Sequence, residues 1–176
     1  MNTKKVKIRA TAYSGKGYGT LRLHLFENAR QHIEKSMENG YYCEAIAIIE
    51  SVITDRLESR LIYLKPTAIG FRNLGSAISE LKGCEEDTVI KAMLCALDNW
   101  REKRNSALHE LVKIEEGQPM LQWDQRIQSL SSSAGEGYYL LKKLYNRVAD
   151  LNPRHKDRVF ECPTQEEEAL FVKLSS

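Results

Sequence analysis

Arg104, Asn105 and His109 are the residues whose types and spacing could most directly do chemistry. Cleavage of RNA without a metal needs a base for the 2′-hydroxyl, a proton donor for the leaving oxygen, and positive charge at the phosphate. Histidine can serve in either proton role near neutral pH. Arginine can bond two phosphate oxygens at once through its planar guanidinium, and the Asn105 amide can donate a further hydrogen bond. One interpretation of these three residues is therefore phosphodiester chemistry.

The spacing of these residues limits that interpretation. On an ideal helix Arg104 and His109 point about 140° apart, whereas Asn105 and His109 share a face. One histidine is too few for a complete acid–base pair, and a symmetric dimer would bring two copies to one cleft. The structural alternative is that Arg104 pairs with a core carboxylate such as Glu50 while His109 caps the helix end. Spacing alone favours this simpler alternative, because an arginine and a histidine at such a distance recur by chance.

The three residues lie late in the longest helical pattern of the chain, which runs from about Thr88 to Ile114. Its apolar stripe consists of Ile90, Met93, Leu94, Leu97, Trp100, Leu108 and Leu111. Arg104 falls on the same stripe, four residues from both Trp100 and Leu108. A bare guanidinium is costly to bury, so Arg104 is expected to have an anionic or carbonyl partner.

The helices around this element form a bundle in the predicted fold. Two helical patterns separated by Asn39-Gly40 predict an antiparallel hairpin. The first has Leu21, Leu25, Ala29, Ile33 and Met37 on its inner face; the second has Ala45, Ile46, Ile49, Ile53, Leu57, Leu61 and Leu64, and ends before Pro66. Shorter helices are expected at 73–81 and 121–130, with Asp87 or Thr88 capping the long helix. Residues 131–137 are expected to be a loop or a frayed join before a helix over 138–151.

The two ends of the chain differ from this bundle. Alternation of apolar and polar residues over 5–12 predicts a strand, followed by a Gly-rich loop. All charged residues in positions 1–26 are basic, which suggests either a phosphate-facing edge or a solubilising tail. The C-terminal tail contains a capping box, Thr164 to Glu167, and is expected to form either a strand pairing with 5–13 or a docking helix.

The predicted fold class is therefore all-α, an antiparallel four- to five-helix bundle with a short N-terminal extended segment. Its expected parts are an arm over 1–20, the bundle over 21–151 and a tail over 152–176. The net charge of +2 excludes a uniformly basic nucleic-acid coat. The four scattered cysteines are expected to be reduced thiols of a cytoplasmic protein, with no metal site and no cofactor. No apolar run is long enough for a membrane span, and no secretory signal is visible.

The segment Arg104-Asn105-Ser106-Ala107-Leu108-His109, late in a long helix that follows a helical hairpin, resembles the motif of the HEPN superfamily. The resemblance covers roughly Leu21 to Leu151, with only Arg-Asn-x-x-x-His specific. It implies an all-α bundle that dimerises to align two motifs in a cleft. It also implies catalytic roles for Arg104 and His109, with Asn105 assisting, in a metal-independent endoribonuclease.

The function predicted from these observations is RNA cleavage by 2′-hydroxyl attack in a prokaryotic defence or toxin–antitoxin system. The RNA would bind to a homodimer, and its phosphate backbone would be held by Lys103 and by the arm residues Lys5, Lys7 and Arg9. A non-catalytic HEPN module that binds a nucleotide or partner, as an accessory or sensor subunit, is the alternative. An antitoxin or a nucleotidyltransferase is the expected partner in such systems. A purely structural helical bundle is the third hypothesis.

Overall fold

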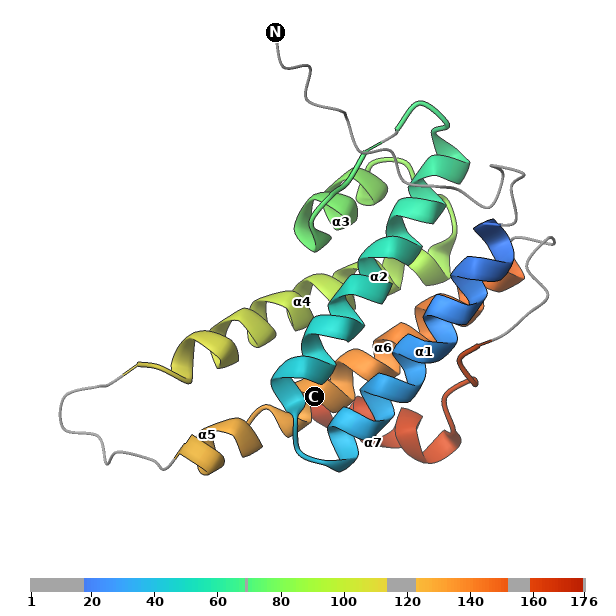
Figure 1. Ribbon diagram of the computed structural model, residues 1–176. Helices are drawn as coiled ribbons and strands as arrows, with labels where there is room; N and C mark the ends of the chain where they lie inside the picture. Colours follow the sequence, from blue (N-terminus) through green and yellow to red (C-terminus); the bar gives the residue numbers. More distant parts are fainter. Residues whose placement is uncertain (1–17, 69, 114–122, 152–158, 176) are drawn as a thin grey trace, which may run out of the picture.

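The computed structural model describes residues 18–68, 70–113, 123–151 and 159–175, and every regular element within these ranges is an α-helix. The helices are α1 (Tyr18–Glu38), α2 (Tyr42–Leu64), α3 (Leu74–Lys82), α4 (Thr88–Glu110), α5 (Trp123–Gln128), α6 (Ser131–Asp150) and α7 (Gln165–Ser175) (Figure 1). The all-α prediction is confirmed for this part of the chain. The predicted strand over 5–12 lies outside the described residues. Residues 18–20, expected in the Gly-rich loop, begin α1.

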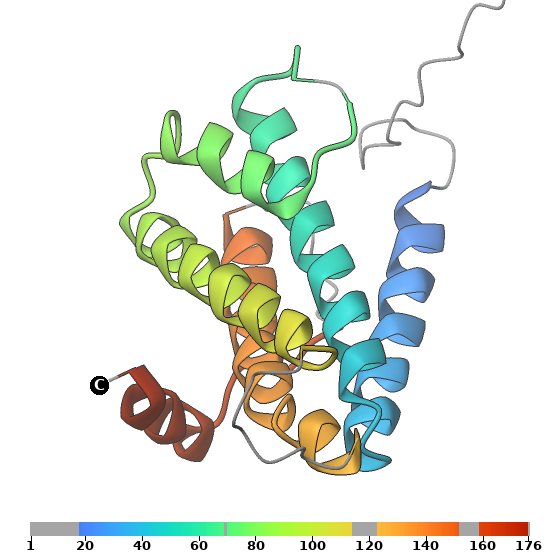
Figure 2. The same cartoon turned by 90° about the vertical axis from the view of Figure 1, so that its left-hand side faces the viewer.

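The helices pack around α2 and α6. Helix α2 contacts α1, α3 and α6, and α4 lies against α6 and α3 (Figures 1 and 2). Helices α1 and α2 form the predicted antiparallel hairpin, joined by a turn in which Gly40 has a φ of 76°. This left-handed conformation suits glycine, and it lets the Tyr41 amide donate back to the Ser36 carbonyl at 2.7 Å.

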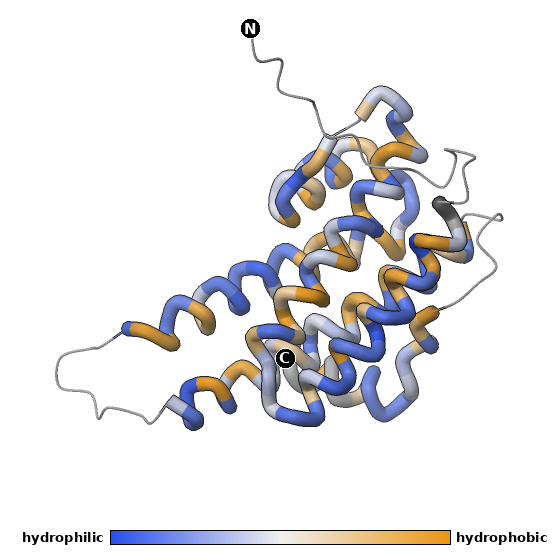
Figure 3. Tube along the Cα trace, in the orientation of Figure 1, coloured by the Kyte–Doolittle hydropathy of each residue, from blue (hydrophilic) through white to orange (hydrophobic). Residues whose placement is uncertain are grey.

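The inner faces of α2 and α4 agree with the sequence pattern. Along each helix apolar residues recur among polar ones, as expected for a helix with one apolar face (Figure 3). The buried apolar residues of these two helices are Ala45, Ile46, Ile49, Val52, Ile53, Leu57 and Leu61 on α2, and Ile90, Met93, Leu94, Leu97 and Trp100 on α4. Arg104 is buried on the same stripe of α4, as the pattern predicts.

The inner face of α1 differs from the prediction, because Leu21 and Leu25 are 57% and 58% exposed. A strict four-residue repeat drifts by about 40° per step on an α-helix, so Leu21 lies about 120° away from Ile33. Phe26 and Ile33 share the buried face instead. Arg22 lies close to that face and donates to the Asp55 carboxylate of α2.

Residues 131–137, predicted as a loop or frayed join, are the first turns of α6. Trp100 of α4 packs against this segment, and its indole Nε1 donates to the Ser133 carbonyl at 2.8 Å. Gly137 lies directly against the ring, since a Cβ built there would sit 2.5 Å from Trp100 Cζ2. The tertiary contact with Trp100 therefore overrides the low helix propensity of the Ser/Gly-rich sequence.

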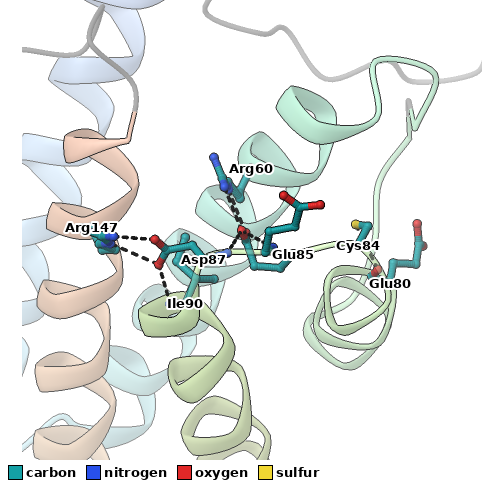
Figure 4. A network of polar contacts seen from close by, with 8 residues as sticks. Arg60, Glu80, Cys84, Glu85, Asp87, Ile90 and Arg147 are labelled. Carbon is teal, nitrogen blue, oxygen red and sulfur yellow. Dashed lines mark hydrogen bonds and ion pairs between the residues drawn. The ribbon is translucent and has the colours of Figure 1, made fainter.

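An ionic network whose Arg60 and Glu85 are buried fixes the N-terminal end of α4 (Figure 4). The Arg60 guanidinium donates to both Glu85 oxygens at 2.8 Å, and Glu85 Oε1 also accepts from the backbone amide of Asp87 at 3.0 Å. Asp87 accepts from the Ile90 amide at 2.9 Å, which confirms it as the N-cap of α4, and it also pairs with Arg147 of α6. Three elements, α2, α4 and α6, meet at these two carboxylates.

The C-terminal tail docks as a helix. The Thr164 hydroxyl accepts from the Glu167 amide at 3.2 Å while Glu167 accepts from the Thr164 amide at 2.8 Å, so the predicted capping box is confirmed. Lys142 of α6 donates to both Glu167 oxygens, at 2.6 and 2.8 Å. Of the two expected forms of the tail, residues 165–175 adopt the helical one; residues 5–13, the proposed strand partner, lie outside the described ranges.

We expect Gly137→Ala to lower the free energy of unfolding by about 2 kcal/mol or more, because the new methyl group overlaps the indole of Trp100. Gly135→Ala is the matched control on the same helix, since apart from its own turn of α6 no atom lies within 4 Å of its added Cβ. That variant should gain about 0.5–1 kcal/mol from helix propensity. Urea denaturation measures both. Equal effects of the two substitutions would contradict the packing explanation.

We expect Glu85→Gln to cost about 2–4 kcal/mol at neutral pH, because it leaves the Arg60 guanidinium without its counter-charge. Burial disfavours the ionised form of Glu85, but the hydrogen bonds from Arg60 and from the Asp87 and Glu86 amides outweigh it and hold the pKa below 4.5. A carboxylate with a depressed folded-state pKa stabilises fully above its unfolded pKa, and this contribution is lost as pH falls through the folded value.

Denaturation of wild type and Glu85→Gln from pH 7 to pH 3 should therefore show a stability difference that shrinks below about pH 4.5. Glu86→Gln, at the exposed neighbouring position, is the control and should change stability little at any pH. A difference that is as large at pH 3 as at pH 7 would rule out the ionic explanation.

Candidate functional site

Arg104 is held between α4 and α2 by a bidentate ion pair. The residue is 8% exposed, and its Nη1 and Nη2 atoms donate to Glu50 Oε2 and Oε1, both at 2.8 Å. Its Cζ atom also lies 5.6 Å from the centroid of the Trp100 ring. The pairing with Glu50, considered above as the structural alternative, is present in the fold.

This pair lies at the edge of the core, since the Glu50 side chain is 30% exposed and the Arg104 side chain 10%. The bidentate geometry fixes the plane of the guanidinium and uses two of its five N–H bonds. The Arg104 Nε atom is buried and has no hydrogen-bond partner among the described residues. The guanidinium is thus oriented by Glu50, with donor capacity left over.

His109 and Asn105 differ from Arg104 in burial. His109 is exposed on the last turn of α4, and Asn105 is partly buried. Because Arg104 is turned inward and His109 outward, the two side chains lie on different faces of the helix, as their five-residue separation predicts. A single chain therefore does not bring the arginine and the histidine together, while Asn105 and His109 share a face.

The C-terminal end of α4 is capped from α5. The helix ends at Glu110, before the predicted Ile114, and Ile114 itself lies outside the described residues. Arg126 Nη1 donates to the carbonyl oxygens of Glu110, Leu111 and Lys113 at 2.8, 3.1 and 2.7 Å. The cap that the structural alternative assigned to His109 is supplied by Arg126. Sequence reasoning missed this residue, because no periodic or spacing signal links it to α4.

The predicted RNA-binding lysines are only partly described. Lys103 is exposed, and its Nζ atom lies 3.4 Å from Glu136 Oε1 of α6. Arg101, one turn before Arg104, is paired with Asp98 at 2.9 Å. Lys5, Lys7 and Arg9 lie outside the described residues. Lys103 and Arg101, the described cations on either side of Glu102, are therefore each matched by a carboxylate.

The described part of the chain contains no group of three or more His, Cys, Asp or Glu residues placed to hold a metal ion. No disulfide joins any of the four cysteines, all of which lie in the described ranges. None of the helices in the described ranges combines the length and apolar character that crossing a bilayer requires.

Comparison of the chain with protein-family models, with characterised proteins and with solved structures gives no match.

We expect a double-mutant cycle on Glu50→Gln and Arg104→Gln to give a coupling free energy of about 1–3 kcal/mol, because the pair is bidentate and largely shielded from water. The exposed pair Glu110 and Lys113 is the control, with side chains 54% and 55% exposed. Its coupling should stay below about 0.5 kcal/mol. Urea denaturation at low and high salt measures both cycles; coupling in the Glu50 cycle no larger than in the control would show that the pair is not stabilising.

Proposed function

We propose that this chain is a HEPN-type, metal-independent endoribonuclease of a prokaryotic defence or toxin–antitoxin system, active as a homodimer. The observation that carries the proposal is the state of Arg104, which Glu50 holds in one orientation near the end of the helix that exposes His109. A fixed guanidinium costs little reorganisation when charge develops on a phosphate. An exposed imidazole is accessible to substrate, and histidine is the side chain that most often transfers protons in catalysis.

The proposed reaction is an intramolecular transesterification, in which the 2′-oxygen replaces the 5′-oxygen on phosphorus. A neutral His109 would take the proton of the 2′-hydroxyl, and the resulting oxygen would attack phosphorus. The bond from phosphorus to the 5′-oxygen breaks, and that oxygen takes a proton from a second acid. The products are a 2′,3′-cyclic phosphate and a 5′-hydroxyl end, so no water, metal or oxidant is consumed in this step.

Arg104 would stabilise the extra negative charge on the phosphoryl oxygens in this mechanism. Glu50 occupies two of the five N–H bonds of the Arg104 guanidinium. Because the Nε atom is buried and the side chain is 10% exposed, a phosphate would have to approach the remaining Nη hydrogens from the side where Glu50 is open to solvent. Asn105, on the same face as His109, would orient the ribose or the phosphate through its amide.

The proposed homodimer would bring together two groups that a single chain keeps apart. Arg104 and His109 of one chain lie on different faces of α4, so a cleft formed with a second copy would bring an arginine of one protomer to a histidine of the other. The second histidine would supply the acid that a single chain lacks. Lys103, with Lys5, Lys7 and Arg9, would hold the RNA backbone, and the affinity should fall with added salt.

A non-catalytic HEPN module is the second candidate function. Glu50 neutralises the charge of Arg104, and a neutral pair attracts a phosphate less than a free arginine does. In this case the same surface would bind a nucleotide or a protein partner, such as an antitoxin or a nucleotidyltransferase.

We expect the purified protein to cleave RNA in the presence of EDTA and to leave 2′,3′-cyclic phosphate ends. His109→Ala should lower the rate by about a hundredfold or more, since it removes the proton-transfer group, without changing stability because the residue is exposed. Arg104→Lys should also be strongly impaired, because an ammonium cannot reproduce the bidentate geometry. His32→Ala, at an exposed histidine of α1, is the matched control and should retain full activity.

Mixing the two inactive variants tests the dimer. Heterodimers of His109→Ala and Arg104→Lys contain one intact arginine and one intact histidine, whereas each parent homodimer lacks one of the two groups entirely. Activity should therefore rise above that of either parent, and should stay below wild type because the second histidine is missing. RNA that stays intact at every protein concentration, together with nucleotide or partner binding by calorimetry, would overturn the nuclease proposal and select the second candidate.

A further inference from the structure

The end of α4 that carries His109 lacks the usual helix terminator. Its C-cap residue, Leu111, has α-helical backbone angles, with φ −55° and ψ −36°, rather than the left-handed conformation that often closes a helix. The last carbonyl groups of a helix have no partner within the helix and must find donors elsewhere. At this end the donors come from a side chain.

Arg126 supplies these donors through one nitrogen atom. Its Nη1 lies 2.8, 3.1 and 2.7 Å from the carbonyl oxygens of Glu110, Leu111 and Lys113. An Nη atom carries two hydrogens, so at least one of these hydrogens is shared between two of the three carbonyl oxygens. The guanidinium also places positive charge at the negative end of the helix dipole. Arg126 thus holds the last turn of α4 and the three residues after it at once.

The element that carries Arg126 is small. Helix α5 has six residues, none of them buried, and it touches α2, with Ile127 packed partly against the core (Figure 1). Glu110, whose carbonyl is held by Arg126, directly follows His109. The backbone next to the histidine is therefore tied to α5 through the Arg126 side chain.

We propose that Arg126 is a positioning residue for His109, one that acts by fixing the terminal turn of α4 and not by touching RNA. The proposal rests on the ribonuclease function proposed above. A displacement of about 1 Å in a group that takes part in chemistry can lower a rate by as much as about a hundredfold. Loss of the Arg126 cap would let the last turn of α4 fray and would displace the His109 imidazole. The proposed phosphate contacts of Arg104 would stay in place, because Arg104 lies earlier in the helix and is held by Glu50.

The test compares Arg126→Gln and Arg126→Lys with a matched control, Arg72→Gln. Arg72 also donates from Nη1 to two loop carbonyls, of Ala68 and Gly70 at 3.3 and 3.2 Å, but it lies between α2 and α3, at the other end of α2 from the hairpin turn. Arg126→Gln should lower kcat for RNA cleavage about tenfold or more with KM changed less than about twofold. Arg126→Lys should recover most of kcat, because an ammonium has three N–H donors for the same carbonyls. Arg72→Gln should leave both constants unchanged.

Failure of this inference can be told apart from failure of the ribonuclease function. An unchanged kcat in Arg126→Gln, or an equal loss in Arg72→Gln, would overturn the positioning role in an active enzyme. If the wild type does not cleave RNA, the ribonuclease proposal fails, and the His109 ring signals in an NMR spectrum then test the positioning. Those signals should shift in Arg126→Gln and not in Arg72→Gln, and signals unmoved in both variants would overturn the inference.

Discussion

The contact between Trp100 and α6 is the interaction on which the arrangement of α4 depends. The indole is fully buried, donates to the Ser133 carbonyl, and approaches the backbone so closely that only glycine fits at position 137. The same ring lies beside the Arg104 guanidinium. One aromatic side chain therefore contributes to the packing of α4 on α6, keeps the start of α6 helical, and lies against the arginine of the candidate site.

Helix α2 adds a second constraint, because its charged residues are matched by different neighbours. Asp55 pairs with Arg22 of α1, Arg60 with Glu85 before α4, and Glu50 with Arg104 of α4. A buried charge is expensive when unpaired, so a shift of α2 along its axis would break several pairs together. We interpret these pairs as determinants of one particular packing, in addition to the apolar core that supplies most of the stability.

The two constraints meet at the motif of α4, with consequences for any chemistry there. Arg104 is rigid, inward and charge-balanced, while His109 is outward and close to a helix end held by Arg126. In the proposed ribonuclease the two residues have different roles: Arg104 is a fixed cation for the phosphate, and His109 is an accessible imidazole that transfers protons. The two groups act at one phosphate only if a second molecule completes the site.

Local rules let the sequence determine the helices, because apolar spacing and capping residues act over a few positions. The same reasoning placed Arg104 on an apolar stripe and required an anionic partner for it. Tertiary contacts decided the rest, as where Trp100 made residues 131–137 helical. The outward position of Leu21 has a local cause instead, because a four-residue repeat drifts around an α-helix. Arg126 became the cap of α4 only through the fold, because residues distant in sequence meet where packing brings them, and no local pattern encodes that meeting.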